Sequence, residues 1–286
     1  FFFELCLATN KSYMAGDFWS SSHFKSWLFA PSHRKYCLSQ LPEGEHFTED
    51  EVQIIHFHYA QSIMTLCKTL KLRFRVAATA CVYFKRFYLH QSMVTECDPE
   101  LMVPTTVLLA SKVENMHDVN GETVVREYVS RHFHYRVEQV MEAEYYLLQA
   151  LEFHTVVFHP FKPMENCLES CEAFGVKVAP FADTAWSMLN DSYFTGVSLV
   201  YPPSKIALGC LVMGAMMAQA DISDFLATLG AEHLSNLDAI SKDLIAAYQL
   251  KAAIVPATLE EMVDKLHNLI IERRRDRQSE GPKKGL

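Results

Sequence analysis

Glycine is one residue type that this chain of 286 residues has little of. It contains 10 glycines, against a typical share of about 7%, and no long stretch alternates apolar with polar residues. Half of the residues are hydrophobic, so most of the chain can bury a core instead of staying disordered. These features together predict an all-helical protein with room for two domains.

Long apolar runs and a signal sequence are also missing. No apolar run reaches the ~18 residues that a membrane-spanning helix needs. The opening stretch Phe1–Leu7 is apolar but short, is interrupted by Glu4 and has no basic lead, so it does not fit a signal peptide. We expect Met14 to be the natural start and residues 1–13 to be an extension.

Cysteines in paired spacing are absent too. The eight cysteines are scattered, and most lie in apolar helical patterns, which is typical of buried free thiols in a reducing compartment. Cys167 and Cys171 lie one helical turn apart without a second pair, so we do not expect a zinc site. The cysteine pattern therefore predicts an intracellular protein.

Positive charge is in short supply, since the formal net charge is −8. Coating a nucleic acid requires a net basic face, which this balance argues against without excluding a local basic patch. The basic end, Arg273–Arg277 followed by Lys283 and Lys284, has two interpretations. It is a solvated helix end, or it is a signal for nuclear import or for an acidic partner.

The sequence motifs of common enzymes are missing as well. We find no glycine-rich phosphate loop, no Gly-x-Ser-x-Gly elbow and no His-Glu-x-x-His pair. Thirteen histidines include two His-Phe-His triplets, at 56–58 and 132–134. On a helix, His56 and His58 point to nearly opposite sides and cannot bind one metal together. We expect no catalytic residue, cofactor or metal; an all-helical enzyme that uses these histidines is the alternative.

What the sequence does contain is a series of helical patterns with clear starts. Thr48-Glu49-Asp50-Glu51 forms a capping box, and Asp98-Pro99 is a cap followed by proline at the first helical position. The first five predicted helices start at Thr48, near Val76, at Asp98, at Gly121 and at Arg136, and end near Leu70, Phe87, Lys112, His132 and Leu151.

The pattern starts again after a proline-containing break at 159–163. Pro203 corresponds to Pro99, which indicates a repeat of about 100 residues, and Met216 or a neighbour takes the place of Lys112. Later predicted helices cover Phe181–Tyr193, a stretch after Pro203, a short one from Ile222, Leu234–Leu250 and Thr258–Arg273. We expect four segments: an N-terminal extension with a short helix (1–47), two bundles (48–158 and 159–252), and a C-terminal helix and tail (253–286).

Two charged residues fall on otherwise apolar helix faces. Lys112 lies on a line with Leu109 and Val113, and Glu144 lies between Met141 and Leu148 at helical spacing. A buried charge is expensive unless it is paired. The two residues therefore either pair with each other inside the chain or lie at a partly apolar surface that receives a partner.

An aromatic segment precedes the first bundle. Phe18, Trp19 and Trp27 form a surface too large to leave in water, and His23 lies among them. The segment docks on the chain's own core, or it completes a partner-binding surface.

These features resemble the cyclin family. Ala110-Ser111-Lys112-Val113-Glu114, a later helix with Glu144 and an aromatic at Phe153 resemble the cyclin box. The arrangement Phe-Trp-x-Ser-Ser-His at 18–23 and the stretches 190–193 and 199–203 are similar to the C-type members. The resemblance implies two tandem five-helix cyclin boxes with an extra N-terminal helix and a C-terminal helix and tail.

The resemblance also implies a function. C-type cyclins are non-catalytic subunits that bind and activate a cyclin-dependent kinase of the Mediator complex in the nucleus and so regulate transcription by RNA polymerase II. Lys112 and Glu144 would pair with the kinase, and Glu114 would be an auxiliary acid. An apolar pocket would be formed by Leu109, Val113, Leu148 and Phe153, with a further contact surface at Phe18, Trp19, His23 and Trp27.

Asn115 departs from the family pattern, because relatives usually have a second glutamate there. We therefore expect this chain to make one charge contact fewer with the kinase than its relatives do. Two alternatives stay open at this point. One is another transcriptional cyclin; the other is a DNA-binding general transcription factor of double cyclin fold, which would want a basic face and a zinc ribbon.

Overall fold

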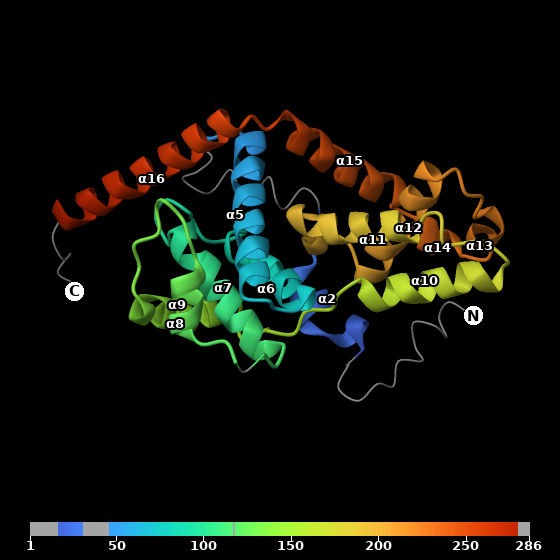
Figure 1. Ribbon diagram of the computed structural model, residues 1–286, viewed down its shortest axis with the longest axis horizontal. Helices are drawn as coiled ribbons and strands as arrows, with labels where there is room; N and C mark the ends of the chain where they lie inside the picture. Colours follow the sequence, from blue (N-terminus) through green and yellow to red (C-terminus); the bar gives the residue numbers. More distant parts are fainter. Residues whose placement is uncertain (1–16, 31–45, 117, 280–286) are drawn as a thin grey trace. The chain divides into compact units, whose positions relative to one another are not determined.

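The computed structural model describes residues 17–30, 46–116 and 118–279, and every regular element in these ranges is a helix (Figure 1). The predicted start at Met14, the proline-containing linker before residue 46 and the lysines near the C-terminus lie outside the described residues. Two compact units are present. The Lys112 unit comprises residues 30–155 and 250–286, and the Met216 unit comprises residues 1–29 and 156–249.

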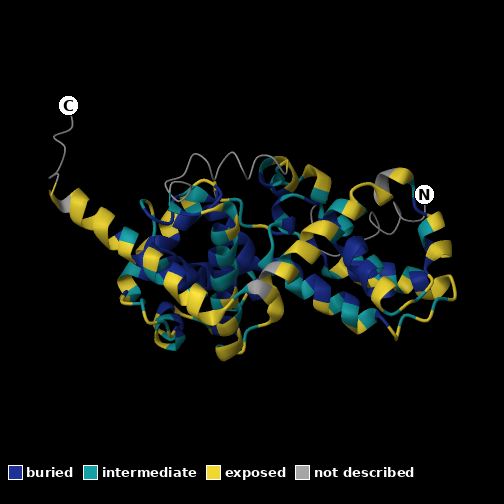
Figure 2. Ribbon diagram, turned by 90° about the horizontal axis from the view of Figure 1, so that it is seen from above, coloured by how far each residue is buried: buried dark blue, intermediate teal, exposed yellow. Residues whose placement is uncertain are grey.

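The Lys112 unit is a bundle around two buried helices. Its helices are α5 (Glu49–Thr69), α6 (Phe74–Phe87), α7 (Pro99–Val113), α8 (Gly121–Glu127), α9 (Val137–Ala150) and α16 (Pro256–Ser279). From Val76 onward every residue of α6 is buried, and so is most of α7. Figure 2 shows the buried residues of the molecule in dark blue. Small side chains such as Ala77 and Ala80 allow α6 to sit between its neighbours.

Local caps set the starts of these helices as predicted. The backbone N–H of Glu51 donates to Thr48 Oγ1 over 3.3 Å, and the N–H of Thr48 donates to Glu51 Oε2 over 2.7 Å. The N–H of Glu100 donates to Asp98 Oδ1 over 3.0 Å ahead of α7, which opens with Pro99. These bonds satisfy backbone donors that have no partner within the helix.

The fourth helix is shorter than predicted. We expected it to reach His132, but α8 ends at Glu127. The chain then turns extended at Tyr128, whose hydroxyl donates to the buried Glu100 carboxylate over 2.9 Å. Seven residues on, the Tyr135 hydroxyl donates to Asp98 over 2.7 Å. A continued helix could not deliver both hydroxyls to the start of α7, so the tertiary contacts override the local helical pattern.

The last helix is longer than predicted and belongs to the Lys112 unit. It runs from Pro256 to Ser279, and in Figure 1 it crosses the end of α5. Leu266 and Ile270 are buried on its inner face. The arginine-rich part of the basic end, Arg273–Arg277, is helical, and one of its members, Arg274, donates to Asp98 Oδ2 over 3.1 Å.

The Met216 unit has its own core. Its elements are η1 (Phe18–Ser20), α2 (Ser22–Trp27), α10 (Phe161–Ala173), α11 (Ala182–Asp191), η2 (Ser192–Phe194), η3 (Val197–Leu199), α12 (Pro203–Met217), α13 (Ser223–Ala227), α14 (Ala231–Leu234) and α15 (Leu237–Ala253, of which residues to 249 belong here). The buried Phe181 and Phe225 are among its largest core side chains. Gly214 lets α12 approach α11 closely, since a Cβ there would lie 3.0 Å from the backbone nitrogen of Ala185.

The aromatic N-terminal segment docks within the Met216 unit. His23 and Trp27 are 2% and 3% exposed. The N–H of Phe158 donates to His23 Nδ1 over 3.0 Å, and the N–H of Phe29 donates to the carbonyl of Leu199 over 2.8 Å. The segment is therefore fixed by its own chain.

The internal repeat is visible in the ends of α7 and α12. Both helices have 15 residues and begin with proline. Each is followed by a residue in the left-handed region, Asn115 (φ 58°) and Gln219 (φ 54°). The next N–H donates back to the helix in both cases, from Met116 to Ser111 over 2.8 Å and from Ala220 to Ala215 over 2.9 Å. This match places Met216 at the position of Lys112, as the sequence predicted.

The six cysteines in the described ranges are free thiols, as predicted, and five of them are buried. Burial raises the pKa of Cys81 and of Cys210 to about 12, which keeps these thiols protonated and unreactive. Among the described helices, none combines the length and apolar character needed to cross a membrane.

Candidate functional site

The centre of the candidate site is an ion pair between α7 and α9. Lys112 Nζ lies 2.6 Å from Glu144 Oε1 and 2.6 Å from Glu144 Oε2. The Lys112 side chain is 47% exposed, whereas that of Glu144 is 8% exposed. The internal pairing is therefore present in the structure, whereas binding of a partner at this surface stays a prediction. The two charges pair inside the chain, and the ammonium is still reachable from outside.

Lys112 is much more exposed than Glu144, and this difference has a chemical consequence. A lysine ammonium carries three donors, and the carboxylate of Glu144 engages only part of that capacity. Glu144 orients the ammonium and compensates its charge, since an isolated buried carboxylate would be costly. The outward side of Lys112 can then donate to carbonyl or carboxylate oxygens of another molecule.

The four apolar residues that the resemblance assigns to the pocket differ in their exposure. Phe153 is 70% exposed, Val113 and Leu148 are half-buried, and Leu109 is buried at 4% exposure. The predicted pocket residues thus comprise one buried residue and three accessible ones. Tyr145, which follows Glu144 in sequence, is 75% exposed and was not among the predicted site residues.

Phe153 owes its exposure to the way α9 ends. Glu152 and Phe153 both have left-handed backbone angles, with φ of 52° and 59°. The N–H of Phe153 donates to the carbonyl of Leu148 over 2.9 Å, which closes the helix end. Two successive non-glycine residues in this region cost conformational energy, so the surrounding structure holds Phe153 in place.

Glu114 has a different place from the one the resemblance implies. Its Oε2 accepts from Arg75 Nε over 2.7 Å, and its Oε1 accepts from the hydroxyl of Thr79 over 2.7 Å. Both donors lie on α6, and the Glu114 side chain is only 15% exposed. In this structure Glu114 ties the end of α7 to α6.

The N-terminal contact residues divide into two groups. His23 and Trp27 are buried in the Met216 unit, whereas Trp19 is 48% exposed. Phe18 is half-buried and its ring lies 5.2 Å from that of Trp19 and 5.5 Å from that of Phe158. Of the four predicted residues, Trp19 and the outer side of Phe18 are accessible to a partner.

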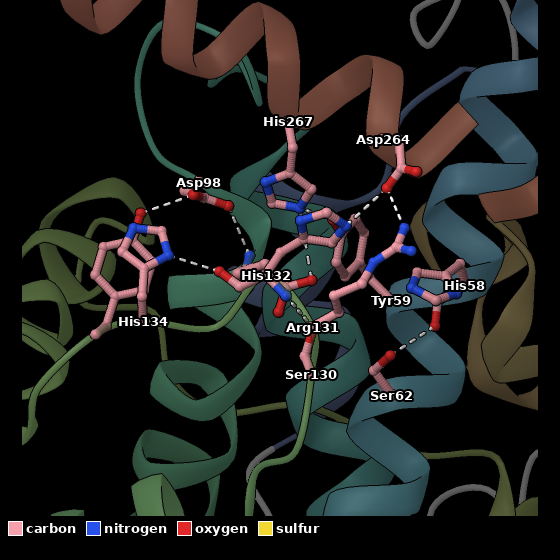
Figure 3. A network of polar contacts seen from close by, with 12 residues as sticks. His58, Tyr59, Ser62, Asp98, Ser130, Arg131, His132, His134, Asp264 and His267 are labelled. Atoms are coloured by element: carbon pink, nitrogen blue, oxygen red, sulfur yellow. Dashed lines mark hydrogen bonds and ion pairs between the residues drawn. The ribbon is translucent and has the colours of Figure 1, made fainter. Parts of the chain in front are cut away.

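A polar network that the sequence did not reveal joins α16 to the rest of the Lys112 unit (Figure 3). His132 Nε2 lies 2.9 Å from Asp264 Oδ1, and the rings of His132 and His267 are stacked. His267 Nε2 lies 3.4 Å from the Tyr59 hydroxyl and 3.7 Å from Glu100 Oε1. These residues come from segments far apart in the sequence and meet only in the folded chain. No local sequence pattern could therefore have predicted the network.

The electrostatics of this network indicate a structural role. Burial alone would raise the pKa of Glu100, but hydrogen bonds from His267, Ser130 and Tyr128 together bring it below its ordinary value. Burial and the nearby Glu100 charge raise the pKa of Tyr59. Across the described part of the chain, no three His, Cys, Asp or Glu side chains are grouped as a metal site requires.

Comparisons with known proteins concern the family to which the chain belongs. The cyclin N-terminal domain family matches residues 34–156. Cyclin-C of Rattus norvegicus is 34% identical over 230 residues, which cover 77% of this chain and 78% of that protein. Cyclin-C of Drosophila melanogaster is 33% identical over 253 residues, covering 83% and 90%.

The fold comparison points the same way. A chain in the structure of the CAK complex of Chaetomium thermophilum bound to ATP-γ-S superposes with a TM-score of 0.74 at 19% identity, covering 94% of this chain and 96% of that one. Such low identity shows the fold alone. The two relatives above share a third of their residues with this chain over most of their length, and cyclins regulate protein kinases without performing catalysis. This chain therefore belongs to the cyclin family, as a non-catalytic regulator of a protein kinase.

Proposed function

We propose that this chain binds and activates the cyclin-dependent kinase of the Mediator complex, alongside other kinase-module subunits, and thereby regulates transcription by RNA polymerase II in the nucleus. The observation that carries the proposal is the half-exposed Lys112–Glu144 pair on an apolar surface. The similarity to C-type cyclins at residues 18–23 and over most of the chain supports this choice of kinase.

The site suits a kinase segment that leads into a helix. The remaining donor capacity of Lys112 can bind backbone carbonyls of that segment, while Phe153 and Val113 receive apolar side chains of the helix. Glu144 keeps the ammonium in position and so reduces the entropy lost on binding. Because the site is already formed in the free chain, binding requires little rearrangement.

Activation follows from selective binding. A protein kinase needs an ion pair between its nucleotide-binding lysine and the glutamate of its regulatory helix. A partner that binds only the inward position of that helix shifts the kinase toward the active state by its differential affinity. The chain contributes binding free energy to this equilibrium and takes no part in phosphoryl transfer.

The test is a binding and activation titration with the purified Mediator-associated kinase. We expect Lys112→Ala to weaken binding by about 2 to 5 kcal/mol, since the contact becomes desolvated in the complex. The double variant Lys112→Ala/Glu144→Ala should bind the kinase as weakly as Lys112→Ala does. It also removes the Glu144 carboxylate, which the single variant leaves without its partner. Met216→Ala is the matched control, because Met216 has the same place in the second repeat.

The titration and a DNA-binding assay separate three alternatives: a pair that only stabilises the fold, a different kinase partner, and binding to DNA. If both Lys112 variants lost thermal stability but activated the kinase normally, the pair would serve the fold only. If the chain activated a different transcriptional kinase in preference, the assignment to Mediator would be wrong. A gel-shift with duplex DNA at moderate salt addresses the DNA-binding alternative, and we expect no shifted band at a net charge of −8.

A further inference from the structure

The turn between α5 and α6 concentrates positive charge in an otherwise acidic chain. Within eight residues it carries four cations and no acid, against a formal net charge of −8. All four side chains are exposed. We call this set the turn patch; it consists of Lys68, Lys71, Arg73 and Arg75.

The backbone of the turn is held in one conformation. The N–H of Lys71 donates to the carbonyl of Lys68 over 3.0 Å, and the N–H of Leu72 donates to the carbonyl of Cys67 over 2.9 Å. Lys71 itself has a left-handed φ of 54°. Arg73 then precedes α6 as its N-cap residue without a side-chain cap bond. Two of the cations, Lys71 and Arg73, therefore lie on a short, closed turn, and the other two lie on the helix ends that flank it.

Most of the turn patch has no ionic role within the chain. Among the described residues, Lys68, Lys71 and Arg73 form no ion pair. Arg75 alone is paired, through Glu114 at 2.7 Å. Clustered like charges repel one another, so a set without internal partners lowers stability slightly unless something outside compensates it.

An apolar side chain lies within the turn patch. Phe74 is 38% exposed and lies between Arg73 and Arg75 in sequence. A ligand that satisfied the cations would therefore also meet part of an aromatic ring. This combination suits a protein segment that carries both acidic and apolar side chains, which a bare polyanion does not.

The turn patch is also connected to the candidate site. Arg75 binds Glu114, which directly follows α7, and Lys112 lies two residues earlier. A partner seated on Lys112 can thus reach the turn patch without leaving this unit. Net charge further selects the kind of partner, since a chain of −8 repels a nucleic acid over long range but tolerates a short acidic segment.

We propose that the turn patch is a second recognition surface, which binds an acidic segment of a partner protein containing an apolar side chain. Exposed ion pairs contribute a few-fold in affinity each, so the surface acts together with the Lys112 site and adds specificity and association rate. Binding at the turn patch does not require the kinase assignment to be correct.

The experiment uses the full chain and two fluorescein-labelled probes, a 12-residue peptide of Asp and Glu with a central Leu, and the same peptide with Glu at the centre. Anisotropy is measured at low and high salt. We expect both peptides to bind the native chain at low salt, and binding to weaken at high salt. Neutralising three cations, as Lys68→Gln/Lys71→Asn/Arg73→Gln, should weaken both peptides about tenfold.

A charge-matched control is available on α16. Arg273→Gln/Arg275→Gln/Arg277→Gln removes three exposed arginines and changes the net charge by the same amount. This variant should bind like the native chain, and an equal loss in both triple variants would overturn the proposal, because net charge alone would explain it. Absence of peptide binding to the native chain would overturn it as well.

Two further measurements sharpen the test. Phe74→Ala should weaken the Leu-containing peptide but not the all-acidic peptide, so the second probe also reports that the variant is folded. If a single-stranded DNA of equal charge bound the native chain more tightly than either peptide, and the turn-patch variant lost this binding, the surface would be one for nucleic acid and the proposal would be wrong.

Discussion

His132 and His267 stack face to face, with ring centroids 3.9 Å apart and an interplanar angle of 12° (Figure 3). His132 follows α8 and His267 lies on α16, so the stack joins parts of the chain that are more than 130 residues apart in sequence. An acidic group lies near each ring, Asp264 at His132 and Glu100 at His267. This contact anchors the C-terminal helix.

Removing His267 should therefore loosen α16. His267→Leu leaves the 1%-exposed Glu100 with one hydrogen-bond partner fewer, which costs about 1–3 kcal/mol of unfolding free energy. His134→Ala is the comparison variant: His134 is exposed and its Nδ1 lies 2.7 Å from the carbonyl oxygen of His132, a solvent-exposed contact whose loss should cost less, up to about 1 kcal/mol. Urea unfolding measures both, and equal stabilities would contradict the anchoring role.

A histidine on α5 predicts a pH dependence. Burial lowers the pKa of His58 below its ordinary value of 6.5, and the nearby His267 and His132 add to this, while Glu100 opposes it. As pH falls below 6.5, the unfolded chain takes up this proton before the folded chain does, so stability decreases until folded His58 titrates. Above pH 6.5 both states are neutral at this position and the contribution is constant.

His58→Gln removes this contribution. Between pH 6.5 and the lowered pKa of His58, the unfolding free energy of the variant should fall less steeply with decreasing pH, by up to about 1.4 kcal/mol per pH unit. Urea unfolding at several pH values gives the two slopes. Parallel curves for the native chain and the variant would show that His58 does not titrate differently on folding.

We expect position 214 not to tolerate even the methyl side chain of alanine. A Cβ at Gly214 would lie 2.9 Å from the Cβ and 3.1 Å from the Cα of Ala185, so α11 and α12 would have to separate. We expect Gly214→Ala to destabilise the chain by about 1–3 kcal/mol, although alanine favours a helix. Gly209→Ala should cost less, since it meets the side chain of Ile240 at 2.7 Å, and a side chain can rotate. The reverse order in thermal unfolding would contradict this.

Two substitutions of Asn115 should change the stability of the chain in opposite directions. It adopts φ of 58° after α7, a conformation that asparagine tolerates and glycine prefers. Asn115→Gly should be neutral or stabilising by up to about 1 kcal/mol, whereas Asn115→Val should destabilise by about 1–2 kcal/mol. Denaturation midpoints compare the variants, and similar values for Gly and Val would show that the backbone is not restrained there.

Asn115 has a backbone role of its own in this structure. The position ends a helix in a left-handed turn, so the backbone requirement is at least as strict as any charge requirement. The auxiliary acid that the resemblance places beside Lys112 is meanwhile engaged by Arg75 and Thr79. Among the described residues, Lys112 and Glu144 therefore form the ionic part of the candidate site.

Features that depend on neighbours in sequence were predictable. The starts of α5 and α7 follow from a Thr48–Glu51 capping box and from Asp98-Pro99, because caps act over three or four residues. Lys112 and Glu144 stood out as charges on apolar helix faces, since helical periodicity is a local property. The internal repeat, in which Met216 takes the position that corresponds to Lys112, could also be recognised from the sequence.

Features that depend on distant segments were not predictable. The end of α8 was placed too late because Tyr128 and Tyr135 bond to Glu100 and Asp98, residues about 30 positions away. The length and docking of α16 follow from contacts such as that of His267 with Tyr59, more than 200 residues apart. Sequence patterns carry no information on which surface a terminal helix will meet.

The amino-acid sequence by itself determined that this protein is helical, that it repeats one unit of about 100 residues, and that only one of the two repeats has a lysine at the end of its third helix. These properties follow from periodicity and capping along the chain. Only the tertiary structure decided that Glu144 is buried while Lys112 stays half-exposed, because burial depends on which side chains from other helices cover each atom. That difference in exposure is what leaves the ammonium of Lys112 available to a partner.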